Sequence, residues 1–241
     1  FRTGRIANGD TMEYGWLPDG SVYFLSERDG RHHLYTTGVD GGTPKQLTNG
    51  AWEITALQLS KDKKTWYFTS NEVHPGESQL YSMPLQGGAR TRLTTKSGWY
   101  GFTLSPDEQH VALTYSGPIS PGELFVMSNA PKVAEKKLTE SAKEEFKRYP
   151  WQASEIVSFD DGEGHTLYAD VWKPARVHPS RPAIIQVHGS GWAQGVYRRW
   201  SNTTPFYHYL LQEGYIVLNL DYRGSRGYGR DFRTAIYRHM G

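Results

Sequence analysis

The chain has 241 residues with 27 basic and 25 acidic side chains, which gives a formal net charge of +2. This balance gives no reason to expect nucleic acid or an anionic membrane surface as a partner. The absence of cysteine excludes disulfides, zinc–thiolate sites and a cysteine nucleophile. No apolar stretch reaches the roughly 18 residues that a membrane-spanning helix needs.

The chain begins with Phe1-Arg2-Thr3-Gly4, which contains neither an initiator methionine nor the basic and then apolar regions of a signal peptide. We therefore expect further residues upstream. The compartment stays open between periplasm and cytoplasm, because the segment that would decide it is expected there.

Residues 12–139 repeat a pattern every 44–46 residues. A Leu-aromatic pair and a later Leu-Thr pair recur at matching offsets, at Leu34-Tyr35, Leu80-Tyr81 and Leu124-Phe125 and at Leu47-Thr48, Leu93-Thr94 and Leu138-Thr139. In each unit an aspartate turn precedes a β-type run, over residues 22–25, 66–69 and 111–115. Four short strands in about 40–45 residues is the period of a β-propeller blade. The alternative, a β-sandwich of regular hairpins, explains the matched offsets less well.

These units account for about three blades. Propellers usually have about 4–8 blades, so the others are expected upstream. The third unit departs from the pattern, because Asn129-Ala130-Pro131 stands where the first two units have Gly41-Gly42 and Gly87-Gly88. His32 and His33 are adjacent in the first unit, and adjacent strand residues point to opposite faces. A shared metal ion is therefore not expected.

The second part of the chain has a different pattern. The charge-rich residues 135–148 indicate a linker; a plain linker is the preferred interpretation, and a short solvated helix over residues 142–146 is the alternative. Residues 156–159 and 166–172 alternate around a glycine-containing turn and predict a β-hairpin. Two apolar runs follow, at residues 183–187 and 215–220, and such runs are typical of buried strands.

Helices are expected after each of these two runs. Thr204-Pro205 fits the start of the first helix, which ends at Gly214. Its apolar stripe is predicted to comprise Phe206, Tyr209 and Leu210. A second helix is expected over residues 231–240. Strand, helix, strand and helix indicate an α/β fold from about residue 183 onward.

The first run leads into His188-Gly189-Ser190-Gly191, and the second leads into the arginine- and glycine-rich loop of residues 221–229. Acyl transfer passes through a tetrahedral intermediate whose oxyanion needs preorganised N–H donors. Small residues after a strand allow the backbone to direct an N–H group toward the substrate. The His188–Gly191 turn is therefore a candidate oxyanion-hole region.

Together the blades, the hairpin, this turn and the 221–229 loop resemble the prolyl oligopeptidase family of serine peptidases. The match is nearest to its dipeptidyl-peptidase and acylaminoacyl-peptidase branches. The resemblance implies a partial β-propeller of about three blades over residues 1–148, followed by the N-terminal part of an α/β-hydrolase catalytic domain over residues 149–241. It also implies acyl-enzyme cleavage of short peptides without cofactor or metal, no nucleic-acid partner, and a homodimer as one form of the intact enzyme.

The family resemblance assigns roles to single residues. His188 heads the turn where the family has His-Gly-Gly-Pro and where the dipeptidyl peptidases carry a tyrosine whose hydroxyl helps to bind the oxyanion. Ser190 and Gly191 stand in place of Gly-Pro, and Gly189 completes the oxyanion-hole region. Supporting residues of the active-site loop are expected at Asp221, Arg223 and Gly224.

None of the triad residues is identified in the chain. No Gly-x-Ser-x-Gly occurs, so the nucleophile, acid and base are expected beyond Gly241 and the chain alone is predicted to be inactive. Ser190 is therefore not expected to be the nucleophile. His188 precedes the expected nucleophile, whereas the base follows it in these folds. For Asp221 we expect an ion pair or hydrogen bond to the Arg223 loop.

Two other functions compete with a peptidase. A non-catalytic β-propeller binding module with an appended α/β segment would explain the lack of a triad, but not the turn after residue 187. A lipase or esterase would use the same turn, although a propeller favours peptides. Recognition of a peptide amino terminus would need acidic blade residues, for which the candidates are Glu13, Glu27, Glu53, Glu72 and Glu77. No paired-glutamate motif is present, so the sequence leaves dipeptidyl and acylaminoacyl specificity both open.

Overall fold

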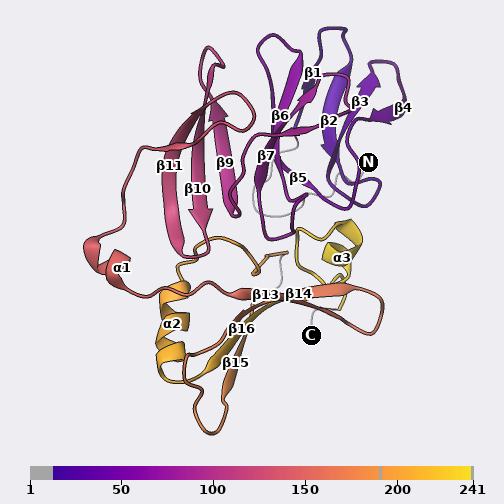
Figure 1. Ribbon diagram of the computed structural model, residues 1–241. Helices are drawn as coiled ribbons and strands as arrows, with labels where there is room; N and C mark the ends of the chain where they lie inside the picture. Colours follow the sequence, from indigo (N-terminus) through magenta and orange to yellow (C-terminus); the bar gives the residue numbers. More distant parts are fainter. Residues whose placement is uncertain (1–12, 190–191, 240–241) are drawn as a thin grey trace.

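The computed structural model describes residues 13–189 and 192–239, in which four four-stranded sheets form (Figure 1). The first three are antiparallel and follow one another along the chain. The first contains β1 (Tyr14–Trp16), β2 (Val22–Ser26), β3 (His33–Gly38) and β4 (Gly41–Gln46). The second contains β5 (Ile54–Leu59), β6 (Thr65–Ser70), β7 (Gln79–Pro84) and β8 (Thr91–Arg92). The third contains β9 (Trp99–Leu104), β10 (His110–Gly117), β11 (Ser120–Ser128) and β12 (Lys136–Lys137). These are the blades of the partial propeller that the repeat predicts.

The aspartate turns of the repeat connect the first and second strands of each blade. In the second blade Asp62 accepts hydrogen bonds from Ser60 Oγ at 2.7 Å and from the Lys64 N–H at 3.0 Å. The residue after each aspartate has a positive φ, of 81° at Gly20, 58° at Lys63 and 57° at Glu108 in the third blade. Only the first blade uses glycine for this conformation, although glycine adopts it without strain.

The Leu-Thr repeat joins the outermost strand of each blade to its neighbour. The hydroxyl oxygens of Thr48, Thr94 and Thr139 accept hydrogen bonds from the N–H groups of Leu34, Leu80 and Leu124, at 3.0, 3.0 and 2.9 Å. The leucine before each threonine donates its own N–H to the carbonyl of that same partner, at 2.8 Å in all three blades. At each Leu-Thr pair the series of backbone hydrogen bonds between the two strands therefore ends, and the last acceptor is the threonine hydroxyl.

Each of these threonines contacts one further polar side chain, and we call the threonine and that side chain together the Thr bridge. The threonine hydroxyl contacts the side chain that precedes the partner leucine, which is His33, Gln79 or Glu123. The same three side chains reach the backbone two residues after the threonine, at Gly50, Lys96 and Ser141. His33 is thus buried within the blade, while His32 contacts the Ile54 carbonyl at 3.0 Å. The two imidazoles serve different contacts, as expected for adjacent strand residues.

Two apolar clusters fill the spaces between blades. The first joins Leu25 and Leu34 of the first blade to Trp66, Phe68 and other residues of the second. The second joins the second and third blades through a set that contains Leu80, Leu93, Tyr100, Val111, Leu113 and Met127. Each blade therefore buries its faces against its neighbours, as repeat architectures require.

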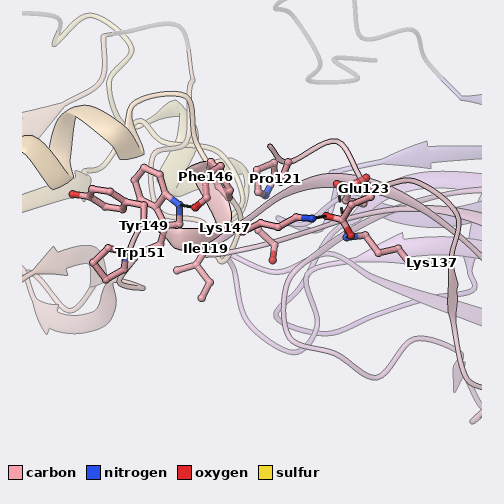
Figure 2. Close-up of a pocket in the computed structure, with 12 residues that line it drawn as sticks. Ile119, Pro121, Glu123, Lys137, Phe146, Lys147, Tyr149 and Trp151 are labelled. Atoms are coloured by element: carbon pink, nitrogen blue, oxygen red, sulfur yellow. Dashed lines mark hydrogen bonds and ion pairs between the residues drawn. The ribbon is translucent and has the colours of Figure 1, made fainter. Parts of the chain in front are cut away.

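The linker contains α1 (Glu144–Arg148), two residues later than predicted. Beyond it Trp151 donates its indole N–H to the Phe146 carbonyl at 2.9 Å and packs on Trp200. A groove of about 380 Å³ lies between this linker and the third blade, and its lining includes Ile119, Glu123, Lys137 and Lys147 (Figure 2). The aromatic contacts of Trp151 connect the linker to the fourth sheet.

The fourth sheet contains β13 (Glu155–Asp160), β14 (Thr166–Trp172), β15 (Ala183–Val187) and β16 (Ile216–Asp221), in the spatial order β13-β14-β16-β15. The predicted hairpin forms β13 and β14, which pair in antiparallel fashion. β15 and β16 pair in parallel, with α2 (Thr204–Gln212) in the crossover between them. In Figure 1 this sheet lies below the three blades. The order and directions are those of the start of an α/β-hydrolase sheet.

β15 differs from its prediction as a buried strand. Among the described residues it pairs only with β16, and it forms the edge of the sheet. Ile185 is 62% exposed and Val187 is 53% exposed. The apolar run predicts a strand covered on both faces; Ile184 packs against the α2 cluster, whereas no element of the described chain covers the face that carries Ile185 and Val187.

The helices also correct two predictions. Of the predicted stripe, Leu210 is buried, whereas Phe206 and Tyr209 are exposed, and Tyr207 and Leu211 complete the face that packs against Trp172 and Val217. The prediction is wrong at the two aromatic residues because aromatic side chains occupy both faces of this helix, so apolar character alone does not identify the buried face. Gly214 ends the helix with a φ of 82°, as expected.

The last helix, α3 (Arg230–Thr234), is shorter than the predicted 231–240. Successive turns follow it, with hydrogen bonds from Tyr237 to Thr234 and from His239 to Ile236. Met240 lies outside the described residues. No helix in the described part of the chain is long and apolar enough to cross a membrane.

Each blade contributes a contact to a helix or loop that flanks the fourth sheet. The Gly30 carbonyl in the first blade accepts the Arg230 N–H at 2.8 Å. Asn71 in the second blade donates to the Gly227 carbonyl at 2.8 Å. Ser116 in the third blade accepts the Trp200 N–H at 3.1 Å. The loops around the candidate site therefore lie between the sheet and the propeller.

Candidate oxyanion site

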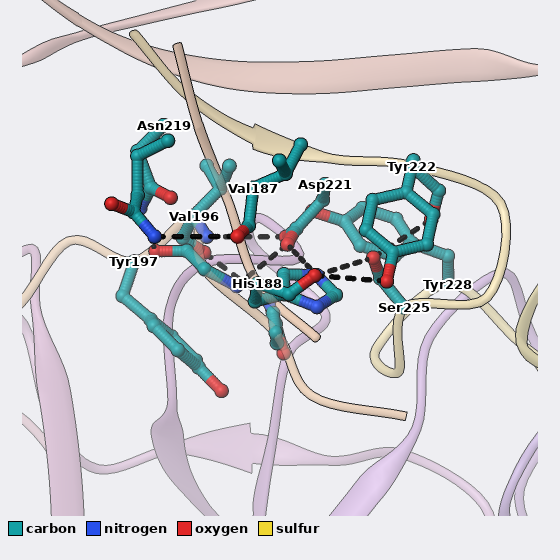
Figure 3. Close-up of polar contacts among 12 residues, drawn as sticks. Val187, His188, Val196, Tyr197, Asn219, Asp221, Tyr222, Ser225 and Tyr228 are labelled. Atoms are coloured by element: carbon teal, nitrogen blue, oxygen red, sulfur yellow. Dashed lines mark hydrogen bonds and ion pairs between the residues drawn. The ribbon is translucent and has the colours of Figure 1, made fainter. Parts of the chain in front are cut away.

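The predicted turn begins where β15 ends. His188 and Gly189 are described, whereas Ser190 and Gly191 lie outside the described residues. His188 turns its ring toward the end of the neighbouring strand β16 (Figure 3). Because β15 and β16 are parallel, their carboxyl ends lie at the same edge of the sheet. This register brings residues 188 and 221 together across 33 positions of sequence.

The Asp221 carboxylate is fully buried and has four hydrogen-bonding partners. Its Oδ1 lies 3.2 Å from His188 Nε2 and accepts the Gly195 N–H at 2.6 Å. Its Oδ2 accepts the Val196 N–H at 3.2 Å and the Tyr228 hydroxyl at 2.6 Å. One carboxylate therefore fixes both ends of the chain segment that contains the turn, His188 at its start and Gly195 at its end.

Asp221 does hydrogen-bond to the loop of residues 221–229, as expected, but through Tyr228. The Arg223 guanidinium instead pairs with Glu163 in the β13–β14 turn. Asp161 and His165 lie beside Glu163, and Arg223 supplies the positive charge for this acidic group. Gly224 has a φ of 126°, and a Cβ there would lie 3.1 Å from Ile236. Both residues thus shape the loop that carries Tyr228.

The His188 ring is oriented by acceptors on both nitrogens. Nδ1 lies 3.0 Å from the Gly189 carbonyl, and Nε2 lies 2.9 Å from Ser225 Oγ as well as near Asp221. Ser225 donates its own proton to the Tyr222 carbonyl at 2.7 Å, so toward His188 it accepts. The hydrogen bond to Asp221 raises the pKa of His188, although burial opposes this. An imidazolium, with a proton on each nitrogen, satisfies all of these acceptors.

His188, Ser225 and Asp221 resemble a catalytic triad only in composition. A triad places the serine on one ring nitrogen and the aspartate on the other. Here Ser225 and Asp221 both contact Nε2. Ser225 is also fully buried, so no substrate carbonyl can reach it. The three residues support the turn and do not form a nucleophile with its base.

Several residues of the site were not predicted from the sequence. Asn219 donates to the Gly195 carbonyl at 2.7 Å, and Gly195 lies so close that a Cβ there would be 2.8 Å from Asn219 Oδ1. Asp170, next to Asn219 in the register, accepts the Tyr197 N–H at 3.4 Å. A polar residue inside an apolar strand, as at Asn219, is the signal that could have identified this group.

Asp170 is itself an unusual acid. Burial raises the pKa of Asp170 to about 7, and the charge of Asp221 adds to this effect. Hydrogen bonds from Ser154 Oγ at 2.6 Å and from the Tyr197 N–H act in the opposite direction. Two buried carboxyl groups thus lie on neighbouring strands, with Asp221 at the end of β16 and Asp170 within β14, and of the two Asp221 has the histidine partner.

Most of the acidic blade residues named as candidates have partners within the protein. Glu27 pairs with Arg233 of α3 at 2.6 Å, and Glu72 pairs with Arg90 at 2.6 Å. Glu77 lies 3.3 Å from Arg198. Burial raises the pKa of Glu53. The acidic residues Glu27 and Glu77 join the propeller to α3 and to the loop between β15 and α2.

Comparisons with known proteins agree with this geometry. A family model described as the dipeptidyl peptidase IV (DPP IV) N-terminal region matches residues 11–122, and one described as BD-FAE matches residues 169–236. A probable dipeptidyl peptidase 4 of Aspergillus flavus is 29% identical over 92% of this chain and 30% of its own length. Dipeptidyl peptidase 4 of Trichophyton equinum is 28% identical over 99% of this chain and 32% of its own length. The chain thus spans about a third of the length of these relatives.

A solved structure also matches. The crystal structure of Porphyromonas gingivalis dipeptidyl peptidase 4 superposes with a TM-score of 0.79 at 24% identity, covering 95% of this chain and 34% of that one. This likeness shows the fold, a run of propeller blades that leads into the first strands of a hydrolase sheet. Together with the two family models and the curated relatives, it supports the resemblance of the chain to part of a prolyl oligopeptidase-family dipeptidyl peptidase.

Proposed function

We propose that this chain is the junction between the propeller (residues 1–148) and the hydrolase domain (residues 149–241) of a serine peptidase that removes dipeptides from peptide amino termini. The observation that carries the proposal is the turn after β15, whose two ends share the buried Asp221 carboxylate. The names of the curated relatives favour dipeptidyl over acylaminoacyl specificity. The homodimer remains a prediction.

The oxyanion is proposed to bind backbone N–H groups of residues 189–191. The ring of His188 supports this choice, because both of its nitrogens already face acceptors within the protein. A ring in this position cannot replace the tyrosine hydroxyl of the dipeptidyl peptidases. Removing a single oxyanion donor typically lowers kcat about 10²–10³-fold, so the placement of this turn matters for the rate.

The nucleophile is proposed to approach along the open edge of β15. In α/β-hydrolases it lies on a sharp strand-to-helix turn at the same end of the sheet as the oxyanion turn. β15 forms the edge of the described sheet, where a further strand can pair with its backbone, and Ile185 and Val187 leave an apolar face of β15 exposed. The serine Oγ would attack the substrate carbonyl carbon while the histidine base takes its proton. The acyl-enzyme would then form as the amine leaves with that proton.

The test uses the complete reading frame that contains this chain. The purified protein is treated with a fluorophosphonate, and the labelled residue is identified by peptide mass spectrometry. Dipeptide release is measured on peptides with free and with acetylated amino termini. We expect one labelled serine within Gly-x-Ser-x-Gly and cleavage only of the free peptide. Labelling of Ser225 or Ser190, or cleavage of the acetylated peptide alone, would contradict the proposal.

A further inference from the structure

A loop of the second blade lies against the segment that follows the oxyanion turn. The propeller loop comprises residues 74–77, between β6 and β7, and the segment comprises residues 194–198. Neither is a helix or a strand. Arg198 donates its N–H to the Gly76 carbonyl at 2.9 Å, and Gln194 donates to the Pro75 carbonyl at 3.0 Å. The propeller thus contacts the segment through two carbonyl groups of its own backbone.

The backbone of the segment depends on partners from outside it. Four successive N–H groups, those of residues 195–198, donate to Asp221, Asp221, Asp170 and Gly76. The first three partners come from the fourth sheet and the last comes from the propeller. Buried backbone groups must find partners, and this segment finds them in two domains. Its position is therefore determined by both.

Contact at Gly76 leaves little free space. A Cβ on Gly76 would lie 3.0 Å from the Val196 carbonyl oxygen and 3.3 Å from Tyr197 Cα. Both are backbone atoms, so they cannot move aside as a flexible side chain would. Gly76 is not in the left-handed region, so a side chain there would be disfavoured by close contacts, with these two atoms and with His74 Nδ1 of the same loop at 3.3 Å. Any larger residue would push the segment away from the propeller.

Glu77 adds charge to the same contact. Its buried carboxylate accepts hydrogen bonds from Ser97 Oγ and Gln79 Nε2, both at 2.8 Å. The Arg198 guanidinium lies 3.3 Å from it. Because Ser97 and Gln79 both belong to the propeller, the position of the Glu77 carboxylate does not depend on Arg198. The propeller thus presents a preformed surface to the segment.

We propose that the propeller loop is a positioning element for the oxyanion turn, which rests on the proposed function of that turn. Gly76, Gln194 and Glu77 are the positioning residues. The link is Asp221, which contacts Gly195 inside the segment and His188 at the start of the turn. A displaced segment shifts the N–H groups between these two points. A misplacement of about 1 Å in a catalytic constellation can cost roughly 10²-fold in rate.

The test compares matched variants of the complete protein. Gly76→Ala introduces one methyl group at the contact. Gly122→Ala in β11 is the control, because a Cβ there meets no atom within 4 Å. Gln194→Met keeps the side-chain length and removes the donor to Pro75. For each variant we measure kcat, KM, affinity for a peptide boronic acid that forms a tetrahedral adduct, affinity for the product dipeptide, and amide hydrogen exchange.

We expect Gly76→Ala to lower kcat and boronate affinity by at least about tenfold, with KM and product affinity within about twofold. Exchange at residues 195–198 should accelerate by about tenfold or more. Gln194→Met should show the same pattern to a smaller extent, and Gly122→Ala none of it. Unchanged exchange in Gly76→Ala would overturn the contact itself. Accelerated exchange with unchanged kcat and boronate affinity would show a structural contact only and would overturn the positioning role.

Failure of the proposed function would look different. A complete protein that neither cleaves peptides nor binds the boronate would refute the peptidase, and the positioning role would fall with it. The exchange data would still show whether the propeller loop fixes residues 195–198. The two failures are therefore distinguishable from one set of proteins.

Discussion

The blades and the fourth sheet bury polar groups in opposite ways. Each blade repeats the Thr bridge, and three different side chains, His33, Gln79 and Glu123, fill the same place in it. The fourth sheet instead concentrates four donors on Asp221, from residues 188, 195, 196 and 228. The repeated arrangement tolerates substitution at one of its positions, whereas every partner of Asp221 depends on the same carboxylate.

The blades are therefore stabilised independently of one another, whereas several loops of the hydrolase part are stabilised by one shared carboxylate. Loss of one Thr bridge leaves the other two blades with theirs. Loss of Asp221 releases the turn, the following segment and the Tyr228 loop together. Substitutions in the two regions should therefore differ both in size and in how far their effects extend.

The largest effect is expected from Asp221→Asn. The amide cannot accept four hydrogen bonds, and it removes the buried carboxylate that pairs with His188. Breaking a buried charge pair typically costs about 3–5 kcal/mol, so the free energy of unfolding in denaturant should fall by that amount. The exposed turn residue Asp40 serves as the control, and Asp40→Asn should stay within about 0.5 kcal/mol. Equal small effects of both substitutions would contradict the role of Asp221.

Thr94→Val should have the next largest effect. It removes the acceptor for the Leu80 N–H and the donor to Gln79, and both groups are buried. Leaving such groups unsatisfied costs about 2–3 kcal/mol in total. Thr94→Ser keeps the hydroxyl and should cost only about 1 kcal/mol for the lost methyl group. If both variants lost the same stability, packing and not the hydrogen bonds would explain the repeat.

The third blade should respond to acid. Burial alone would raise the pKa of Glu123, but hydrogen bonds from Thr139 and Ser141 and the charge of Lys137 outweigh it and lower the pKa from 4.5 to about 2. A depressed carboxyl pKa stabilises the fold above the unfolded value, and this stability is lost between pH 4.5 and 2. Because its partners Lys137 and Ser141 are exposed and screened by solvent, we expect a loss of about 1–2 kcal/mol relative to Glu123→Gln. Parallel pH profiles of unfolding for the two proteins would exclude this.

The first blade should show the smallest effect, at a different pH. Burial lowers the pKa of His33 below 6.5, with Arg31 and Arg90 adding to this. The unfolded state then binds the proton more readily, so stability is present above pH 6.5 and declines as the pH falls below it. His33→Gln introduces the residue of the second blade and should remove this decline. The free energy of unfolding of both proteins between pH 8 and 5 provides the check, and a decline that persists in His33→Gln would oppose it.

The repeat was predictable from the sequence because identical contacts recur at fixed spacing. Leu-Thr pairs mark strand ends through one local hydrogen-bond pattern, and their period alone indicates blades. The face of α2 was not predictable in the same way. Phe206 and Tyr207 are both aromatic, and only packing on Trp172 decides that Tyr207 is buried. β15 was misjudged as a buried strand because apolar composition does not tell which strand forms an edge.

The sequence predicts the position of the candidate turn but not the hydrogen bonds that hold it. Small residues after a strand indicated the turn, and their position at His188 and Gly189 agrees with the end of β15. The partners of Asp221 are 7 to 33 residues away, and the parallel register of β15 and β16 accounts for His188 alone. Gly195, Val196 and Tyr228 carry no motif that would connect them to a carboxylate. Only the fold brings them together.

The most direct test of this account is a crystal structure of the complete protein with a phosphonate bound to its nucleophile. We predict that the phosphonyl oxygen accepts a hydrogen bond from a backbone N–H of residues 189–191, while the His188 ring stays on Asp221 and Ser225. A His188 ring turned away from Asp221 and bonded to the phosphonyl oxygen would contradict it.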